Sequence, residues 1–332
     1  MTRMLVTGGA GFIGANFVHR TLAKRPEYEI RVLDALTYAG NLDNLRAVAG
    51  DIRFVHGDVC DQRLVDGLVA ESDVVVHFAA ESHVDNSLRD PAPFVRSNVQ
   101  GTYVLLEAVR RHDRRLHHIS TDEVFGDLGA SAQGGFTERS RYDPSSPYSA
   151  TKASADLLVR AWARSFGVAA TLSNCANNYG PFQHAEKFIP RQVTNVLLGD
   201  RPKLYGSGRN IREWTHVDDH NDAVHLILDR GRIGEAYLIG SGCEVSNREV
   251  VESVLEVLGR PASWYETVPD RPGHDLRYAT DSSKLRRELG WRPRYPDLRD
   301  GLSSTVNWYR ENEWWWRPSK KEVEAGYRLM GR

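Results

Sequence analysis

A tyrosine and a lysine four residues apart, Tyr148 and Lys152, follow Ser146 and Pro147. Serine and proline are typical of the start of a helix, and residues four apart share one helix face. A lysine ammonium beside a phenol favours the phenolate and lowers the phenol pKa from about 10 toward neutral pH. The spacing therefore predicts that Tyr148 is a general base and that Lys152 tunes it.

Two acidic residues, Asp122 and Glu123, directly follow a hydroxyl residue, Thr121, where a strand is expected to end. Open parallel sheets bind ligands at the carboxyl ends of their strands, so Thr121 is expected beside Tyr148. Oxidation of an alcohol needs only a base and a redox cofactor. The carboxyl pair therefore indicates a second proton-transfer step, although a solvated strand end whose acids cap a turn has the same sequence.

A glycine-rich loop, TGGAGFIG at residues 7–14, lies between a short apolar run and an amphipathic segment. Gly8 suits a tight turn, Gly11 a close approach of the backbone to a pyrophosphate, and Gly14 close packing of helix on strand. The pyrophosphate then lies at a helix N-terminus, where N–H groups and the dipole favour negative charge. The loop predicts a dinucleotide cofactor.

An aspartate, Asp34, lies 20 residues after Gly14 at the end of the next expected strand. Its carboxylate would accept hydrogen bonds from ribose hydroxyls and repel a 2′-phosphate, and residues 35–37 include no arginine. The cofactor is therefore predicted to be NAD rather than NADP. Asp58 is a further candidate on the adenine side. A turn role is the alternative for both carboxylates.

The elements that would position these groups alternate along the first half of the chain. Short β-branched runs are followed by amphipathic stretches, which is typical of βαβ units and predicts a doubly wound parallel sheet. The expected strands are 4–7, 30–33, 52–56, 74–78, 116–120 and 168–172, and the expected helices are 12–24, 93–111 and 147–166. After about residue 180, helices 187–198 and 247–258 are separated by irregular segments, which indicates a smaller second domain. Four of the eight tryptophans lie in 307–317, a segment expected to pack a terminal helix onto the body.

Composition narrows the class of protein. The 332 residues include 43 basic and 44 acidic side chains, so no overall positive field favours nucleic acid. No apolar stretch approaches the roughly 18 residues of a membrane span, and residues 1–7 lack the apolar core of a secretory signal. Cys60, Cys175 and Cys243 have no metal-ligand spacing, which predicts reduced thiols in the cytoplasm and no metal site.

These motifs resemble the extended short-chain dehydrogenase/reductase superfamily and, within it, the dTDP-glucose 4,6-dehydratases. The most specific match is Thr121-Asp122-Glu123 ahead of Tyr148 and Lys152. Related epimerases carry small or hydroxyl residues at the two acidic positions, and related decarboxylases keep only the glutamate. The matching segments are TGGAGFIG (7–14), DALTYAGNLDNL (34–45), FAAESHVDNS (78–87), STDEVFGDL (120–128), YSATKASAD (148–156), NCANNYGPF (174–182), EKFIP (186–190), IREW (211–214) and DRPGHDLRY (270–278).

The resemblance implies a Rossmann-like doubly wound parallel sheet with a smaller, interleaved C-terminal domain. The NAD-binding domain would comprise 1–178 with returning segments near 211–242 and 279–304. The nucleotide-sugar domain would comprise 179–210, 243–278 and 305–332. Members of the family are usually homodimers, here through helices 93–111 and 147–166.

The resemblance also implies a reaction. Tyr148 would remove the proton of the glucose 4-hydroxyl while C4 gives hydride to NAD. Glu123 would then remove the C5 proton, and Asp122 would protonate the departing 6-hydroxyl. Hydride would return to C6, giving dTDP-4-keto-6-deoxyglucose and regenerating NAD. Asp122 must then be protonated while Glu123 is ionised, as coupled carboxyl groups allow.

Binding residues follow from the same resemblance. Contacts to NAD are expected from Gly8, Gly11, Phe12, Ile13, Gly14, Asp34, Leu36, Thr37, Asp58, Val59, Phe78, Ala79, Ala80, Ser82, Ser97, Tyr148, Lys152 and Asn178. Contacts to the nucleotide sugar are expected from Ser82, Thr121, Asn177, Lys187, Phe188, Lys203, Tyr205, Arg212, Asn247, Arg271 and His274. The two arginines suit two phosphates because a guanidinium offers forked donors.

Three departures from the family pattern, Phe125, Ala176 and Phe188, leave the nucleotide base open. The alternatives are a 4,6-dehydratase that acts on a UDP- or GDP-hexose, a nucleotide-sugar 4-epimerase or decarboxylase, and a non-catalytic NAD-binding scaffold. Asp122 argues against an epimerase or a decarboxylase, and the complete set of reactive residues argues against a scaffold.

Overall fold

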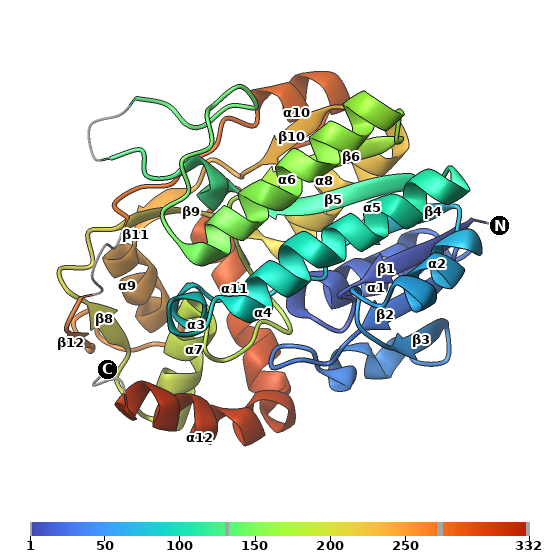
Figure 1. Ribbon diagram of the computed structural model, residues 1–332. Coiled ribbons are helices and arrows are strands. Elements are labelled where there is room, and N and C mark those ends of the chain that lie inside the picture. Colours follow the sequence, from blue (N-terminus) through green and yellow to red (C-terminus); the bar gives the residue numbers. More distant parts are fainter. Residues whose placement is uncertain (1, 130–132, 271–274, 330–332) are drawn as a thin grey trace.

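A computed structural model describes residues 2–129, 133–270 and 275–329 of the chain. Its centre is a seven-stranded sheet in the order β10-β6-β5-β4-β1-β2-β3 (Figure 1), with every neighbouring pair parallel. The strands are β1 (Arg3–Thr7), β2 (Glu29–Asp34), β3 (Ile52–His56), β4 (Val74–His77), β5 (Arg115–Thr121), β6 (Ala170–Cys175) and β10 (Ala236–Ile239). The predicted doubly wound parallel sheet is confirmed, but its seventh strand, β10, was not expected.

Helices cover both faces of the sheet because side chains alternate along each strand. Met4 and Val6 of β1 face the core under α1 (Phe12–Lys24), α8 (Val217–Arg230) and α10 (Ser283–Leu289). Leu5 faces the opposite core under α2 (Gln62–Ala70), α5 (Gly101–His112) and α6 (Pro147–Phe166). All three β1 side chains are at most 2% exposed.

The expected helix 93–111 is interrupted. It consists of α4 (Ala92–Phe94), a π-helical turn η2 (Val95–Gln100) and α5, after a short helix α3 (Val84–Arg89). The π turn holds the buried Asn98, whose amide donates to Glu81 O at 3.1 Å and Thr151 Oγ1 at 2.9 Å. Such turns are common at functional sites. The two hydrogen bonds of Asn98 link α6 to the segment after β4.

A smaller lobe follows β6. Its helices α7 (Phe188–Leu198), α9 (Asn247–Val257), α11 (Leu298–Glu311) and α12 (Glu313–Leu329) share a third apolar core. Strands β7 (Asn177–Tyr179), β9 (Ile211–His216) and β11 (Glu244–Ser246) form one small sheet, and β8 (Lys203–Tyr205) pairs with β12 (Glu266–Val268). Trp315 and Trp316 are buried at 8% and 1% exposure and Trp308 packs against the same core, so these three tryptophans pack the terminal helix as expected, whereas Trp314 is 49% exposed and does not.

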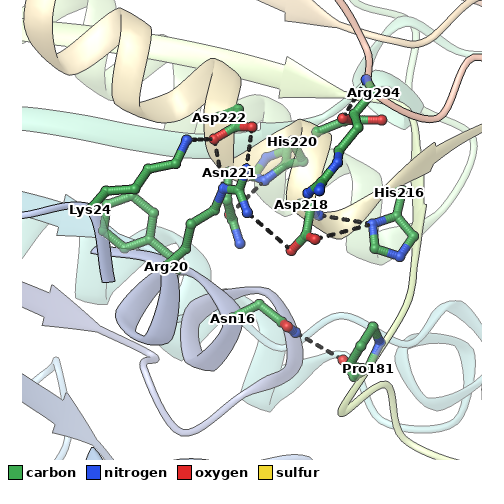
Figure 2. Close-up of polar contacts among 12 residues, drawn as sticks. Asn16, Arg20, Lys24, Pro181, His216, Asp218, His220, Asn221, Asp222 and Arg294 are labelled. Carbon is green, nitrogen blue, oxygen red and sulfur yellow. Dashed lines mark hydrogen bonds and ion pairs between the residues drawn. The ribbon is translucent and has the colours of Figure 1, made fainter. Parts of the chain in front are cut away.

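Charged side chains join α1 to α8, which lie far apart in sequence (Figure 2). Asp222 of α8 pairs with Arg20, whose Nε lies 2.6 Å from Asp222 Oδ1, and with Lys24. At the start of α1, Asn16 donates to Phe12 O at 2.9 Å and Pro181 O at 2.8 Å. The helix that follows the glycine-rich loop is thus held by two later segments of the chain.

Candidate active site

A cavity of about 620 Å³ opens at the carboxyl ends of the central strands, against the smaller lobe. Turns after β1 to β4 form one wall, and we call the lining residues within 8–14, 34–40, 57–59 and 78–82 the cofactor side. The wall from Asn177, Lys187, Phe188, Tyr205, Arg212 and Asn247 is the substrate side. Tyr148, Lys152, Thr121 and Glu123 also line the cavity. The remaining expected residues on the wall are Gly8, Gly11, Phe12, Ile13, Gly14, Asp34, Thr37, Asp58, Val59, Phe78, Ala79, Ala80, Ser82, Ser97 and Asn178.

Three expected residues do not line the cavity. Leu36 packs against the apolar core beside α1, and the Lys203 ammonium pairs with Glu266 on β12. Asp122 lies behind the wall. Arg271 and His274 lie outside the described residues. A place for the phosphates is therefore supported at Arg212 and Lys187 but not at Lys203.

The glycine-rich loop fits a dinucleotide. Gly8 has φ +71°, and a Cβ there would lie 2.5 Å from Ala79 N. A Cβ on Gly14 would lie 2.3 Å from Gly8 O. At Gly11, by contrast, the nearest atom is Gly8 O at 3.3 Å, so packing within the protein does not demand a glycine there. The absent side chain of Gly11 instead enlarges the cavity at the start of α1, where a pyrophosphate would bind.

Asp34 accepts a hydrogen bond from the glycine-rich loop and also lines the cavity. Its Oδ2 accepts from Ala10 N at 2.9 Å and its Oδ1 accepts from Leu36 N at 2.8 Å. Burial raises the pKa of this carboxyl, and the two N–H donors oppose that effect. Asp34 therefore has the turn role, and it also lines the cavity on the side where a ribose is expected. Asp58 accepts from Cys60 N at 2.8 Å and pairs with Arg96.

Helix α6 presents the catalytic pair. Ser146 and Ser149 form a capping box and Pro147 begins the helix, which fixes Tyr148 and Lys152 on one face at 8% and 5% exposure. Lys152 Nζ donates to Ile119 O at 2.8 Å. Two pKa shifts follow from burial: it raises the pKa of Tyr148 well above the ordinary value and lowers that of Lys152.

The expectation of a lowered pKa for Tyr148 is therefore wrong in direction for this structure. Glu123, Cys175 and Asp122 add to the effect of burial, because negative charge disfavours a phenolate, and a hydrogen bond with Thr121 opposes them. The sequence spacing correctly placed Tyr148 and Lys152 on one helix, α6. It did not include the cost of desolvating the phenolate beside two carboxyl groups.

The acidic pair begins a 3₁₀ turn, η3 (Asp122–Phe125), at the end of β5. Asp122 is 1% exposed, its Oδ2 has no hydrogen-bond partner among the described residues, and Thr121 Oγ1 lies 3.3 Å from its Oδ1. Burial raises the pKa of Asp122 well above its ordinary value, and Glu123 and Glu213 add to the shift. The direction agrees with a protonated Asp122 beside Glu123.

The substrate side contains residues that the sequence did not indicate. Arg191 is 2% exposed and lies under Tyr327, with its guanidinium 3.5 Å from the ring centroid. Its Nε also lies 3.1 Å from Glu324 of α12. Arg191 follows Lys187 by one helical turn, which is a usable signal. Nothing in the sequence links Tyr327, at the far end of the chain, to this cavity.

Arg212 and Lys187 are held by backbone carbonyls. Arg212 Nη1 donates to Ile211 O at 2.8 Å and Nη2 to Asp275 O at 2.9 Å, while the guanidinium stacks 4.5 Å from the Tyr278 ring centroid. Lys187 Nζ donates to Ser82 O at 3.2 Å, across from the substrate side to the cofactor side. Both cations are therefore oriented within the cavity.

Comparison with known proteins agrees with this geometry. A family model described as GDP-mannose 4,6 dehydratase matches residues 5–304. A protein named dTDP-glucose 4,6-dehydratase from Mycolicibacterium smegmatis is 62% identical over 329 residues, 99% of each chain. The solved structure of DesIV (dTDP-glucose 4,6-dehydratase) from Streptomyces venezuelae, with NAD and TYD bound, is 49% identical with a TM-score of 0.91, and the match covers 96% of this chain and 99% of that one.

A second solved structure is that of dTDP-glucose 4,6-dehydratase from Bacillus anthracis in complex with NAD. It is 44% identical with a TM-score of 0.89, over 96% of this chain and 99% of that chain. Identity at this level over nearly the full length, together with the glycine-rich loop, Tyr148, Lys152 and Glu123 around one cavity, shows that the chain belongs to the dTDP-glucose 4,6-dehydratase family of NAD-dependent hydro-lyases.

Proposed function

We propose that Tyr148, Thr121, Glu123 and Asp122 perform the proton transfers that convert dTDP-glucose to dTDP-4-keto-6-deoxyglucose. The observation that carries this assignment is an acidic pair that acts on Tyr148, with the Glu123 carboxyl on the cavity wall and the buried Asp122, whose pKa is raised, beside it. Simple alcohol oxidation has no use for that pair, whereas elimination of water needs one base and one acid.

The glycine-rich loop would hold NAD, which would supply the hydride acceptor for oxidation at C4 and the hydride donor for reduction at C6. Tyr148 accepts the proton of the 4-hydroxyl, with Thr121 as its hydrogen-bond partner. Lys152, anchored on Ile119 O, supplies a fixed positive charge beside the phenol. These residues together make the phenol a usable base despite its burial.

Glu123 removes the C5 proton, which the adjacent 4-keto group makes acidic, and Asp122 protonates the departing 6-hydroxyl. Burial raises the pKa of Asp122 well above its ordinary value, which favours the protonated form that an acid needs. Its contact with Thr121 Oγ1, a group on the cavity wall, gives the proton a route to the sugar. A 4-epimerase moves no proton at C5, so it would not need this pair.

The nucleotide sugar is proposed to lie along the substrate side. Arg212 and Lys187 suit the diphosphate, while Tyr205, Phe188, Asn177 and Asn247 line the rest of that wall. A division into an NAD-binding domain at 1–178 and a nucleotide-sugar domain made of the later segments is consistent with the separate apolar core of the smaller lobe.

A homodimer through α5 and α6 is also proposed. The two helices lie side by side on one face of the molecule (Figure 1). Large apolar side chains are exposed along them and on η2, namely Val95 at 53%, Tyr103 at 41%, Leu157 at 57% and Phe166 at 54%. Contiguous exposed apolar residues are typical of an interface.

A cytoplasmic location is proposed from the free thiols of Cys60, Cys175 and Cys243. Among the helices that the structure describes, none combines the length and the apolar composition that crossing a membrane requires.

The proposed reaction is tested by incubating the purified protein with dTDP-glucose, with no NAD added, and measuring the mass of the product by mass spectrometry. We expect a product lighter by one water, which would show dehydration with a retained and recycled cofactor. UDP-glucose and GDP-mannose, tested in parallel, should react at least about tenfold more slowly. An unchanged mass with altered stereochemistry would mean an epimerase, and faster turnover of another nucleotide sugar would overturn the proposed substrate.

A further inference from the structure

The catalytic Lys152 is an ammonium group in the protein interior. It is 5% exposed, and its hydrogen bond within the described residues goes to a carbonyl, Ile119 O, at 2.8 Å. A carbonyl dipole does not neutralise a full charge, and an isolated buried ammonium either has a carboxylate partner or gives up its proton. Lys152 therefore needs a carboxylate partner, and the proposed mechanism does not identify one.

Asp156 occupies the matching position one turn later on α6, so it shares a helix face with Lys152. It is 0% exposed and does not line the cavity. Its Oδ2 accepts from Tyr142 Oη at 3.0 Å and from Asn174 Nδ2 at 2.8 Å. Neither donor is a cation, so neither balances the charge of a carboxylate.

The remaining ionisable groups that face this pair come from four other places. His77 on β4 and His118 on β5 are fully buried, and burial lowers the pKa of both rings, which keeps them neutral. Cys175 on β6 is buried, and burial raises the pKa of its thiol to about 12. Tyr142 precedes α6, and burial raises its pKa as well. None of these groups supplies a negative charge near neutral pH.

One further cation shares the environment of Asp156. Arg160 lies another turn along α6, with its guanidinium 5.3 Å from the Tyr142 ring centroid. His118 Nε2 lies 3.3 Å from Asp156 Oδ1. The acidic residues Glu123 and Asp122 act on Tyr148, and the proposed function assigns them to the proton transfers. Asp156 is thus the carboxylate available to balance Lys152.

We propose that Asp156 is the buried counter-ion of Lys152 and a positioning residue for the reaction, whose charge acts along one turn of α6 and keeps the ammonium charged. Asp156 acts through Lys152 and, through Asn174, on the strand that carries Thr121. Asn174 Nδ2, which donates to Asp156, also lies 3.2 Å from Thr121 O. The catalytic part of this inference rests on the proposed function, whereas the pairing itself does not.

The pairing is tested by thermal unfolding of three variants, Lys152→Met, Asp156→Asn and the double variant. Loss of either partner alone leaves an uncompensated buried charge, whereas loss of both leaves none. We therefore expect Lys152→Met to lower the unfolding temperature and the added Asp156→Asn to recover part of that loss. A double variant that loses the sum of the two single effects would overturn the pairing. This cycle needs no substrate, so it is independent of the reaction.

The positioning role is tested by the pH dependence of kcat for Asp156→Asn with dTDP-glucose. Without the carboxylate, the ammonium loses its proton at lower pH, so the alkaline limb should shift to lower pH by about one unit. KM should stay within about twofold, because Asp156 touches no ligand. Tyr142→Phe is the matched control, since it removes a hydrogen bond to Asp156 but not the charge, and its alkaline limb should stay in place.

An Asp156→Asn profile that superimposes on the wild-type profile would overturn the positioning role, as would an equal loss at every pH that Tyr142→Phe reproduces. If Asp156→Asn alone does not fold, folding of the double variant with Lys152→Met supports the pairing, and failure of both overturns it. A wild-type protein inactive on dTDP-glucose would contradict the proposed function and leave the result of the stability cycle intact.

Discussion

The cofactor side of the cavity is made of backbone turns, and the substrate side is made of long side chains. On the cofactor side, Gly8, Gly11 and Gly14 follow one strand within seven residues, and Asp34 ties their loop through backbone N–H groups. On the substrate side, Arg212 comes from β9 and Tyr327 from α12. The difference teaches that a site built from one local turn tolerates little change in shape, whereas a site built from scattered side chains depends on their charge and orientation.

The largest effect on activity is expected from substitutions of the carboxyl pair, Asp122 and Glu123. Glu123→Gln removes the proposed C5 base and Asp122→Asn the proposed acid, while Tyr148 and the glycine-rich loop stay intact. Each variant should lose about 10²- to 10⁴-fold in product formation yet still oxidise C4. Accumulation of NADH absorbance without a change in product mass would show this. Wild-type rates of product formation in both variants would contradict the assignment.

Arg212→Lys probes the substrate side. The guanidinium is 9% exposed and is held in place by two carbonyls and the Tyr278 ring. Lysine keeps the charge but loses the forked geometry, so KM for dTDP-glucose should rise about 10- to 100-fold with kcat changed much less. Initial-rate kinetics measure both values, and Arg209→Lys at an exposed position is the control. Unchanged KM would place the diphosphate elsewhere.

Gly11→Ala probes the cofactor side. The added methyl meets the protein only at Gly8 O, 3.3 Å away, so the fold should survive while the methyl occupies space assigned to the pyrophosphate. We expect NAD to bind about tenfold more weakly, or about 1.4 kcal/mol. Titration with NAD and thermal unfolding test the two parts separately. Gly50→Ala, in open space, is the control, and equal NAD affinity in both variants would contradict the position of the pyrophosphate.

The smallest effect is expected at the α1–α8 contact that supports the cofactor side (Figure 2). Burial alone would raise the pKa of Asp222, but hydrogen bonds from Arg20 and Lys24 lower it below the ordinary value. The pair is partly exposed, so Asp222→Asn should cost about 1 kcal/mol of unfolding free energy near pH 7.

Because the folded pKa of Asp222 is depressed, its contribution is present above the unfolded pKa of about 3.9 and is lost as pH falls through the folded value. Denaturant unfolding of wild type and Asp222→Asn should therefore differ near pH 7 and converge in acid. A difference that persists below the folded pKa would indicate a packing effect instead of a charge effect.

Much of the fold could be predicted because its signals are local. The strand 52–56 and the helices 12–24 and 147–166 begin and end where the alternation and the capping residues place them. The seventh strand, β10, was missed because four residues from a region of weak alternation carry too little pattern, and only pairing with β6 makes them a strand. The π turn at Val95–Gln100 was missed because sequence periodicity does not distinguish it from a continuous helix.

By itself, the sequence determined the glycine-rich loop, the Tyr148–Lys152 pair, the acidic pair and the family, because each depends on residues close together in the chain. Only the tertiary structure decided the raised pKa of Tyr148, the position of Asp122 behind the wall and the contribution of Arg191 and Tyr327. These properties depend on desolvation and on contacts between distant segments, and neither has a signature in neighbouring residues.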